Sequence, residues 1–189
     1  MSIFSLNELK KLIKEVKKQV LREALEEYVK PDGTVDLYHY SKVDHDAVTL
    51  DPEYFLHSRN PYSKNEWGKA ATPRLFFYLD PKEKERYFAS MPLYKAAVPA
   101  SQIYDLNKDQ KGVVQRVREG GVYPGIFNYE ELLNELSGWE QVGKNWEKTS
   151  RGLHPGVYYK NSQFSVMIYF EPIEVIRVTE EEKQELEKE

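Results

Sequence analysis

The chain has 189 residues and a formal net charge of −4 at pH 7, with 40% hydrophobic and 31% charged residues. This length and balance are typical of one folded domain with appendages and argue against a disordered chain. The net negative charge makes nucleic acid an unexpected main partner, because binding to DNA or RNA depends largely on neutralising phosphates.

The sequence contains no cysteine, which excludes disulfides, thiolate metal sites and a cysteine nucleophile. The first five residues include no apolar run that could serve as a signal peptide. No stretch of about 18 apolar residues predicts a membrane span. We therefore expect a protein of the cytoplasm, or one packaged in a particle.

The N-terminal segment predicts an amphipathic helix. Between residues 6 and 28, apolar side chains recur at steps of three and four, and Ser5 with Glu8 forms a capping box at the start. The other faces are basic in the first half and acidic in the second. Such faces suit a solvated surface, or a helix that docks on a partner protein or forms a coiled coil. We assign residues 1–30 to this helix and leave both interpretations open.

The compact part begins after a Pro-Asp-Gly turn, with a strand over residues 35–41. Side chains alternate between the faces of a strand, so His39 and Ser41 point one way while Tyr38 and Tyr40 point the other. A strand end that presents an imidazole and a hydroxyl together is a candidate wall of a ligand pocket. The alternative is a half-buried histidine that bonds the backbone.

The middle of the chain predicts short helices, each marked by a capping residue at its start. They are expected at 51–55 after Asp51, at 81–89 after Asp80, between Asn107 and Gly120, and at 129–136 after Asn128. Residues 42–49 predict a polar connection. Residues 58–74 predict a surface loop of the length that often carries function.

Strands are expected at 74–79, 93–98, 103–106, 139–142, 146–148, 156–159, 163–170 and 173–178. Because 74–79 is apolar on both faces, we expect it at the centre of its sheet. Thr179 with Glu182 predicts the start of an acidic helical tail over 179–189 that frays. The order of the elements predicts an α+β fold, with the main domain at 31–178.

The sequence lacks the common catalytic and metal-binding motifs. Its histidines form no helical pair of metal-ligand spacing; they are His39, His45, His57 and His154. There is no G-x-S-x-G elbow, no P-loop and no G-x-G-x-x-G. We therefore expect no metal, and we exclude a serine hydrolase, a P-loop kinase and a Rossmann dehydrogenase.

Several segments together resemble the ADP-ribosyltransferase superfamily. They are Leu37-Tyr38-His39-Tyr40-Ser41, then Leu50 to Phe55, then Arg74 to Pro81, and then Tyr94 to Asp105. The closer likeness is to the divergent members carried by phages and polyvalent proteins, in the His-Tyr-Glu branch. It covers residues 35–106, with 156–178 as closing strands. The resemblance implies a split β-sheet core that holds NAD⁺, as a substrate, between two small sheets without a metal ion.

The resemblance also implies how NAD⁺ would be held. His39 would hydrogen-bond a ribose hydroxyl, and the backbone of Tyr40 and the hydroxyl of Ser41 would hold the nicotinamide amide. Tyr78, or a neighbouring aromatic of the same strand, would stack on the nicotinamide ring. The alternative is that these aromatic side chains belong to the core. Tyr40 stands where the better-known branch has glycine, so we expect a tighter pocket.

The catalytic acid is where this sequence departs from the family. There, a glutamate near the start of a late strand stabilises the oxocarbenium-like state in which the nicotinamide bond breaks. The corresponding strand here begins with Gln163, and the nearest acids, Glu171 and Glu174, stand at its far end. A neutral amide can orient a hydroxyl but does not stabilise a developing cation as a carboxylate does. The candidate catalytic residues are therefore His39, Tyr78, Gln163 and Glu171.

Three hypotheses follow. The first is a mono-ADP-ribosyltransferase that transfers ADP-ribose from NAD⁺ to a protein or other macromolecule, in the host cytoplasm if the chain is viral. The second is an inactive binding or structural module of the same fold, such as a phage accessory or virion protein attached to a partner through residues 6–28. The third is an unrelated α+β protein with an accidental His-x-Ser. An acid beside His39, from Glu171 or Glu174, would separate the first hypothesis from the second.

Overall fold

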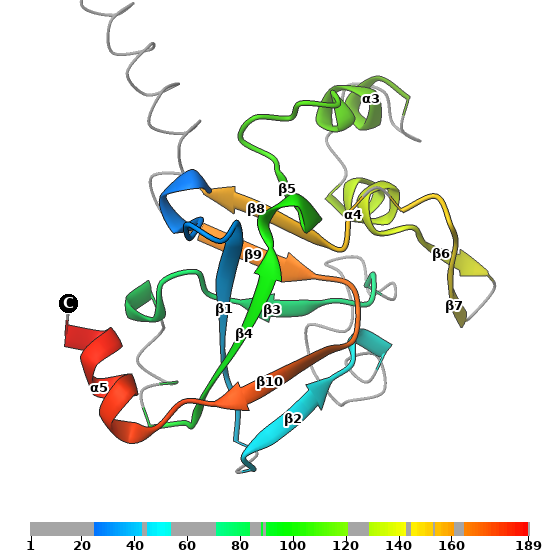
Figure 1. The fold of residues 1–189 in the computed structure, drawn as a ribbon. Coiled ribbons are helices and arrows are strands. Elements are labelled where there is room, and N and C mark those ends of the chain that lie inside the picture. Colours follow the sequence, from blue (N-terminus) through cyan, green and yellow to red (C-terminus); the bar gives the residue numbers. More distant parts are fainter. Residues whose placement is uncertain are drawn as a thin grey trace, which may run out of the picture.

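The computed structural model describes residues 25–42, 45–53, 71–83, 88, 90–120, 129–142, 145–152, 154–160 and 165–188 (Figure 1). Its strands are β1 (Thr34–Tyr40), β2 (Ala47–Leu50), β3 (Leu75–Phe77), β4 (Leu93–Pro99), β5 (Ile103–Asp105), β6 (Trp139–Val142), β7 (Asn145–Lys148), β8 (Gly156–Lys160), β9 (Ser165–Tyr169) and β10 (Ile173–Arg177). Its helices are α3 (Val113–Gly120), α4 (Tyr129–Ser137) and α5 (Glu180–Lys188), with short 3₁₀ helices at Glu26–Tyr28, Pro81–Glu83 and Ala100–Gln102. The predicted α+β class is confirmed. None of the helices in these ranges is long and apolar enough to cross a membrane.

Two sheets form the framework of the fold. In the described ranges, the first sheet has the strand order β1-β4-β10-β2 and the second β3-β9-β8-β5, while β6 and β7 form a separate hairpin. The neighbouring strands of both sheets are antiparallel except β5 and β8, which are parallel. The sheets meet where the residue after β3 bridges to β1. There the Tyr38 N–H donates to the Tyr78 carbonyl at 2.9 Å, and the Tyr78 N–H to the Tyr38 carbonyl at 2.8 Å.

The strand β1 begins at the predicted Pro-Asp-Gly turn. Gly33 has a φ of +79°, a left-handed conformation that glycine adopts without steric cost. The Asp32 carboxylate accepts hydrogen bonds from the N–H and the hydroxyl of Thr34 at 2.9 and 2.7 Å, which fixes the start of the strand. The predicted alternation is confirmed, because Leu37 packs between the two sheets whereas Tyr38 packs on the other face.

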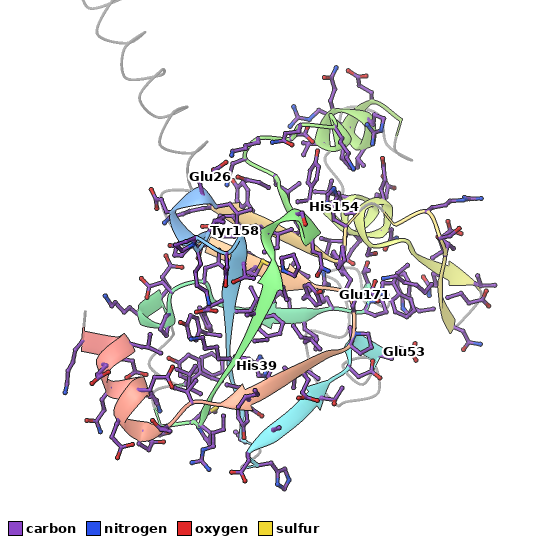
Figure 2. The ribbon with its side chains drawn as sticks, in the orientation of Figure 1. Glu26, His39, Glu53, His154, Tyr158 and Glu171 are labelled. Atoms are coloured by element: carbon purple, nitrogen blue, oxygen red, sulfur yellow. The ribbon has the colours of Figure 1, made fainter. Side chains whose placement is uncertain are left out.

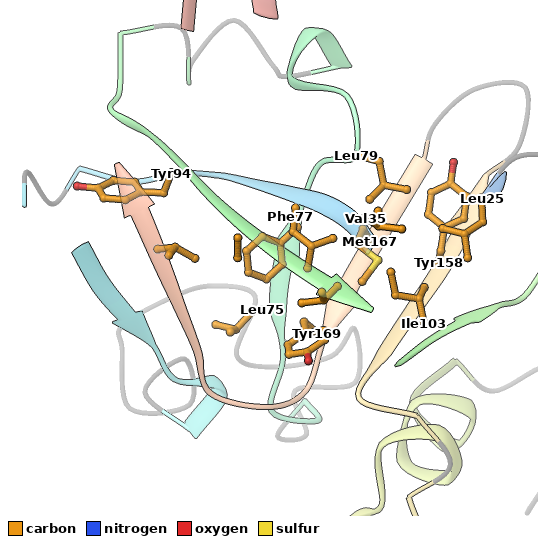
Figure 3. Packing of buried hydrophobic residues seen from close by; sticks show 14 residues of the cluster. Leu25, Val35, Leu75, Phe77, Leu79, Tyr94, Ile103, Tyr158, Met167 and Tyr169 are labelled. Atoms are coloured by element: carbon orange, nitrogen blue, oxygen red, sulfur yellow. The ribbon is translucent and has the colours of Figure 1, made fainter. Parts of the chain in front are cut away.

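Three apolar clusters hold the elements together. The inter-sheet core draws on both sheets (Figure 3) and includes Val35, Phe77, Tyr94, Tyr158 and Met167. The helix core packs the second sheet against α3 and α4 through Val113, Leu133, Leu136, Trp139 and Ile168. The C-terminal core packs β1 and β4 against α5 through Tyr38, Tyr40, Leu93, Val178 and Leu186. Burying one large apolar side chain contributes about 1.5–3 kcal/mol, so these clusters supply the main favourable term in folding.

Several predictions about individual segments are wrong. The polar connection predicted over 42–49 contains the strand β2, which pairs with β10. The strand predicted over 74–79 as central is β3 at the edge of the second sheet, and one of its phenylalanines is 43% exposed. The end of the predicted surface loop, 71–74, is buried, because Arg74 is 5% exposed and donates to Glu130 of α4 at 2.8 Å.

The start of α3 differs from the prediction. The helix is capped by Asp109 rather than by Asn107, because the Asp109 carboxylate accepts the N–H groups of Val113 and Val114 at 2.8 and 3.3 Å. The N–H of Asn107 instead donates to Asp105 at 2.9 Å. The residue that stabilises the helix start therefore lies two positions further along the chain than the capping pattern indicated.

The C-terminal segment packs onto the domain instead of standing apart as a fraying tail. Thr179 begins α5 as predicted, since its hydroxyl accepts the N–H of Glu182 at 3.2 Å. Lys183 is only 6% exposed, and its Nζ donates to the Met91 carbonyl at 2.8 Å. The helix thus covers the face of β1 that carries Tyr40.

Several predictions fall wholly or partly outside the described residues, including the ends of the helices predicted at 51–55 and 81–89. Residues 6–24 of the predicted N-terminal helix lie outside the described residues, as do most of the loop over 58–74, the cap at Asn128 and Gln163. The part of the first segment that is described, from Leu25, turns into β1 through the 3₁₀ helix at Glu26–Tyr28.

Candidate functional site

The first candidate site lies where the backbone pairing between β1 and the β3 side ends. The Tyr38–Tyr78 bridge is isolated. In a continued antiparallel ladder, the next hydrogen-bonded pair would be Tyr40 and Phe76, because such pairs recur at every second residue. At this position the Phe76 carbonyl accepts a hydrogen bond from Nδ1 of His39, with 3.0 Å between the two atoms. The imidazole, labelled in Figure 2, therefore links the two sheets through a side chain where the backbone ladder ends.

Burial sets the protonation of His39. Its side chain is half-buried, and burial lowers its pKa from the usual 6.5, while the hydrogen bond to Phe76 opposes this shift only in part. At neutral pH the ring is therefore neutral, with its proton on Nδ1 and its lone pair on Nε2. The structure matches the interpretation of a half-buried histidine that bonds the backbone. It also makes Nε2 a suitable acceptor for a hydroxyl group.

Tyr40 and Tyr78 direct their rings to the face of β1 opposite His39. The two rings meet edge to face with their centroids 5.9 Å apart. The Tyr40 hydroxyl lies 3.1 Å from both the Pro81 carbonyl and the Glu187 carboxylate, and burial, followed by the charge of Glu187, raises its pKa. The structure therefore does not bring the Tyr78 ring beside the imidazole. The ring that lies there, 5.6 Å away, is that of the buried phenylalanine at position 77.

The backbone of Tyr40 faces the gap between the sheets. Both backbone groups of Tyr38 bond to the residue after β3, so those of His39 face β4 and those of Tyr40 again face the β3 side. Ser41 is half-buried, and its N–H donates to the Pro92 carbonyl at 3.2 Å. By alternation its hydroxyl shares the face of the imidazole. The three groups are neighbours at the end of β1, and their joint role in binding stays a prediction.

The acids predicted to complete the site are directed elsewhere. Glu171 follows β9, and its carboxylate accepts a hydrogen bond from Nζ of Lys148 in β7 at 2.6 Å. This ion pair ties the turn after β9 to the β6–β7 hairpin. Gln163, at the start of the predicted strand, lies outside the described residues.

Glu174 lies on the other face of the first sheet. His39 pairs with Tyr94, and Tyr94 pairs with Arg177 on the next strand, so these three residues share a face. Glu174 precedes Arg177 by three residues in β10, and alternation therefore puts it on the opposite face. There its exposed side chain lines a cavity of about 340 Å³ together with Lys95.

Sequence reasoning missed a second group of polar residues. Asp105, Lys108, Lys111 and His154 line a cavity of about 260 Å³. The signal available in the sequence is weak. Asp105 ends an apolar strand and two lysines follow it within six residues, but His154 is more than 40 residues away along the chain. Neither this cavity nor the one beside Glu174 is lined by the imidazole of β1. Within the described ranges, no three His, Asp or Glu side chains are grouped so that they could hold a metal ion.

No protein-family model matches the chain, and comparisons with curated proteins and with solved structures find no match. The geometry of the gap between β1 and β3, together with the resemblance in the sequence, therefore carries the functional proposal.

Proposed function

We propose that the domain is an ADP-ribosyltransferase-like module that binds NAD⁺ in the gap between β1 and β3 and has lost efficient transfer of ADP-ribose. One observation carries the proposal: the Tyr38–Tyr78 bridge is isolated, and beyond it the imidazole of His39, rather than a backbone group, bonds the Phe76 carbonyl. A split two-sheet core with NAD⁺ at the division is the architecture that the sequence resemblance implies.

The groups at the end of β1 suit the parts of NAD⁺ assigned to them. His39 is neutral and held by Phe76 through Nδ1, so its Nε2 accepts a hydrogen bond from a ribose hydroxyl. The resemblance assigns the carboxamide of nicotinamide to the backbone of Tyr40, whose amide and carbonyl are the kinds of group that pair with a carboxamide. Residues 6–28 supply the contact with a protein partner, as their apolar stripe predicts, which fits an accessory or virion protein of a phage.

The positions of the acids favour binding over transfer. Departure of nicotinamide leaves positive charge on the ribose, and a carboxylate aimed at this charge lowers the barrier. Glu171 is paired with Lys148, and Glu174 lies on the face of the first sheet opposite His39. Gln163 would offer only a neutral amide at this step.

Calorimetric titration with NAD⁺ tests the proposal through a matched pair of variants. His39→Asn retains an N–H for the Phe76 carbonyl but removes Nε2, whereas His39→Ala removes both groups. We expect the wild type to bind NAD⁺ and both variants to bind at least about tenfold more weakly, a change of about 1.4 kcal/mol. Only His39→Ala is expected to lower the unfolding temperature.

His45→Ala serves as the control. The His45 side chain is exposed, and its contact with the Tyr94 hydroxyl at 3.1 Å uses the backbone N–H, which the substitution retains. Chromatography that measures the release of nicotinamide from NAD⁺ separates the active transferase from the inactive module of the same fold. We expect no release, and steady release would show that the domain cleaves the nicotinamide bond of NAD⁺ and is not an inactive module. A folded wild type that does not bind NAD⁺ would contradict both.

A further inference from the structure

A cavity lies at the end of the molecule away from His39. Figure 2 shows Glu26 and His154 towards one end of the view and His39 towards the other. The cavity measures about 260 Å³ and lies between the 3₁₀ helix Glu26–Tyr28, the residues around β5, and His154. Its apolar wall consists of Leu25, Val29, Ala100 and Ile103. An apolar wall beside a few charged groups is typical of sites for small molecules.

The carboxylate of Asp105 is only partly satisfied by the fold. The residue is 9% exposed, and one of its oxygens, Oδ1, accepts the N–H of Asn107 at 2.9 Å. The other oxygen, Oδ2, is buried and makes no hydrogen bond of good geometry in the described structure, although the side-chain amide of Asn107, also unpaired, interacts with this carboxylate. Burial accordingly raises the pKa of this carboxyl. An asparagine could cap the same turn without burying a charge, so the turn alone does not account for an aspartate here.

Two lysines bring positive charge to the same cavity. Nζ of Lys111 lies 3.2 Å from Nε2 of His154. Burial, and then the charge of Lys111, lowers the pKa of His154, so the imidazole is neutral and accepts this hydrogen bond. Lys108 forms an ion pair with Glu26. The wall therefore carries two positive and two negative side chains, and the negative charge of Asp105 is the buried one.

We propose that this cavity binds a small zwitterion with an apolar body, the chemistry of a free amino acid such as leucine. The ammonium group of the ligand lies against the Asp105 carboxylate, which lines the cavity, and the ligand carboxylate accepts from Nζ of Lys111. The apolar side chain of the ligand lies against the wall formed by Leu25, Val29 and their neighbours.

The balance of charge favours a zwitterion over a simple amine or a simple acid. A simple amine would satisfy Asp105 but bring no partner for Lys111, and a simple acid would do the reverse. A ligand with both groups compensates the buried charge of Asp105 and also pairs with the exposed ammonium group of Lys111, so it gains from both ends. This site does not depend on the NAD⁺ site proposed above, because it shares no lining residue with the end of β1.

Titration calorimetry with L-leucine tests this proposal. Isovalerate and isopentylamine are the comparison probes, since each retains the branched body of leucine but carries only one of its charges. We expect L-leucine to bind, and each comparison probe to bind at least about tenfold more weakly.

Two variants locate the site. Asp105→Asn retains the oxygen that caps the turn and removes the buried charge, while Lys111→Met retains the aliphatic stem and removes the ammonium group. Each is expected to weaken L-leucine binding at least about tenfold. Lys82→Met, at an exposed position of the 3₁₀ helix Pro81–Glu83, is the control and is expected to bind as the wild type does. Without ligand, Asp105→Asn is expected to unfold at a higher temperature than the wild type at neutral pH, because a buried charge is removed.

Two results would overturn the proposal. One is the absence of binding heat for L-leucine up to about 10 mM with folded wild type. The other is equal L-leucine binding by the wild type and Lys111→Met. Because Lys111 is exposed, this variant is expected to fold, so the comparison remains decisive even if Asp105→Asn does not fold. His39→Asn is expected to bind L-leucine as the wild type does, so failure at one site is distinguishable from failure at the other.

Discussion

At the scale of single residues, one histidine links the two sheets and makes stability depend on pH. His39 has a lowered pKa in the folded protein, so the unfolded chain takes up a proton at this position more readily. Between the lowered folded pKa and the unfolded value of 6.5, the unfolded chain binds more protons, and stability is lost as the pH falls through this window. Above 6.5 both states are neutral and the contribution is complete. The lowered pKa of His154 acts in the same direction.

We predict that the free energy of unfolding falls between about pH 7 and about pH 5, and that the fall is smaller in His39→Asn. The variant retains the contact with Phe76 but has no titrating ring. Urea unfolding followed by circular dichroism at each pH gives both values. His45→Ala, at an exposed position, is expected to show the full fall. Equal falls in the wild type and His39→Asn would contradict the neutral, buried state assigned to this histidine.

At the scale of elements, two glycines let the end of α4 approach the turn after β7. Gly138 has a φ of +76°, and a Cβ there would lie 2.6 Å from the backbone nitrogen of Gly152. We predict that Gly138→Ala lowers the free energy of unfolding by about 3 kcal/mol or more, because left-handed strain and a backbone clash add. Gly112→Ala, with a φ of +62° and no atom within 4 Å of its Cβ position, is expected to lose about 1–2 kcal/mol. Equal losses in urea unfolding would show that the close approach has no effect.

One buried lysine contributes to the contact of α5 with the domain. Nζ of Lys183 donates to the Met91 carbonyl at 2.8 Å and lies 5.9 Å from the centre of the Tyr40 ring. We predict that Lys183→Ala lowers the free energy of unfolding by about 1–3 kcal/mol, because a buried carbonyl loses a charged donor. Lys188→Ala, at an exposed position of the same helix, is expected to change it by less than about 0.5 kcal/mol. If thermal unfolding shows the same change in both variants, the lysine does not anchor the helix.

Elements with strong local signals could be predicted from the sequence, whereas those defined by their partners could not. The strand β1 has alternating side chains after a Pro-Asp-Gly turn, so its faces were predicted correctly and each of its bounds to within one residue. β2 has only four residues, none of them fully buried, and it becomes a strand by pairing with β10. β3 is apolar on both faces yet lies at an edge, because one side pairs with β9 and the other opens towards β1.

At the scale of the whole molecule, the candidate site was predictable only where its groups are neighbours in sequence. His39 and Tyr40 end β1 and Ser41 follows directly, so the opposite directions of His39 and Tyr40 follow from alternation. The side of β1 taken by the Tyr78 ring and the engagement of Glu171 by Lys148 depend on how distant segments meet. Likewise, the cavity around Asp105 requires residues from three separated parts of the chain, which no local pattern marks.

The inter-sheet core implies that both sheets unfold together, because its side chains come from each of them. We predict the same free energy of opening, by native-state hydrogen exchange, for the amides of Leu37 in β1 and Ile168 in β9. Leu37 pairs with Ala96 of β4, and Ile168 pairs with neighbours on both sides of its strand, so each amide reports on its own sheet.

Phe77→Ala sharpens this test, because it removes a side chain that is 4% exposed in the core shared by the two sheets. We expect it to lower both opening free energies by the same amount, about 3–5 kcal/mol. Val117→Ala removes a side chain from the helix core behind the second sheet. It is also expected to lower the two opening free energies equally, but by less than Phe77→Ala does, because fewer atoms are lost. An amide of Leu37 that exchanges at lower free energy than that of Ile168 would mean that the first sheet opens alone, with the Tyr38–Tyr78 bridge as the boundary between two units.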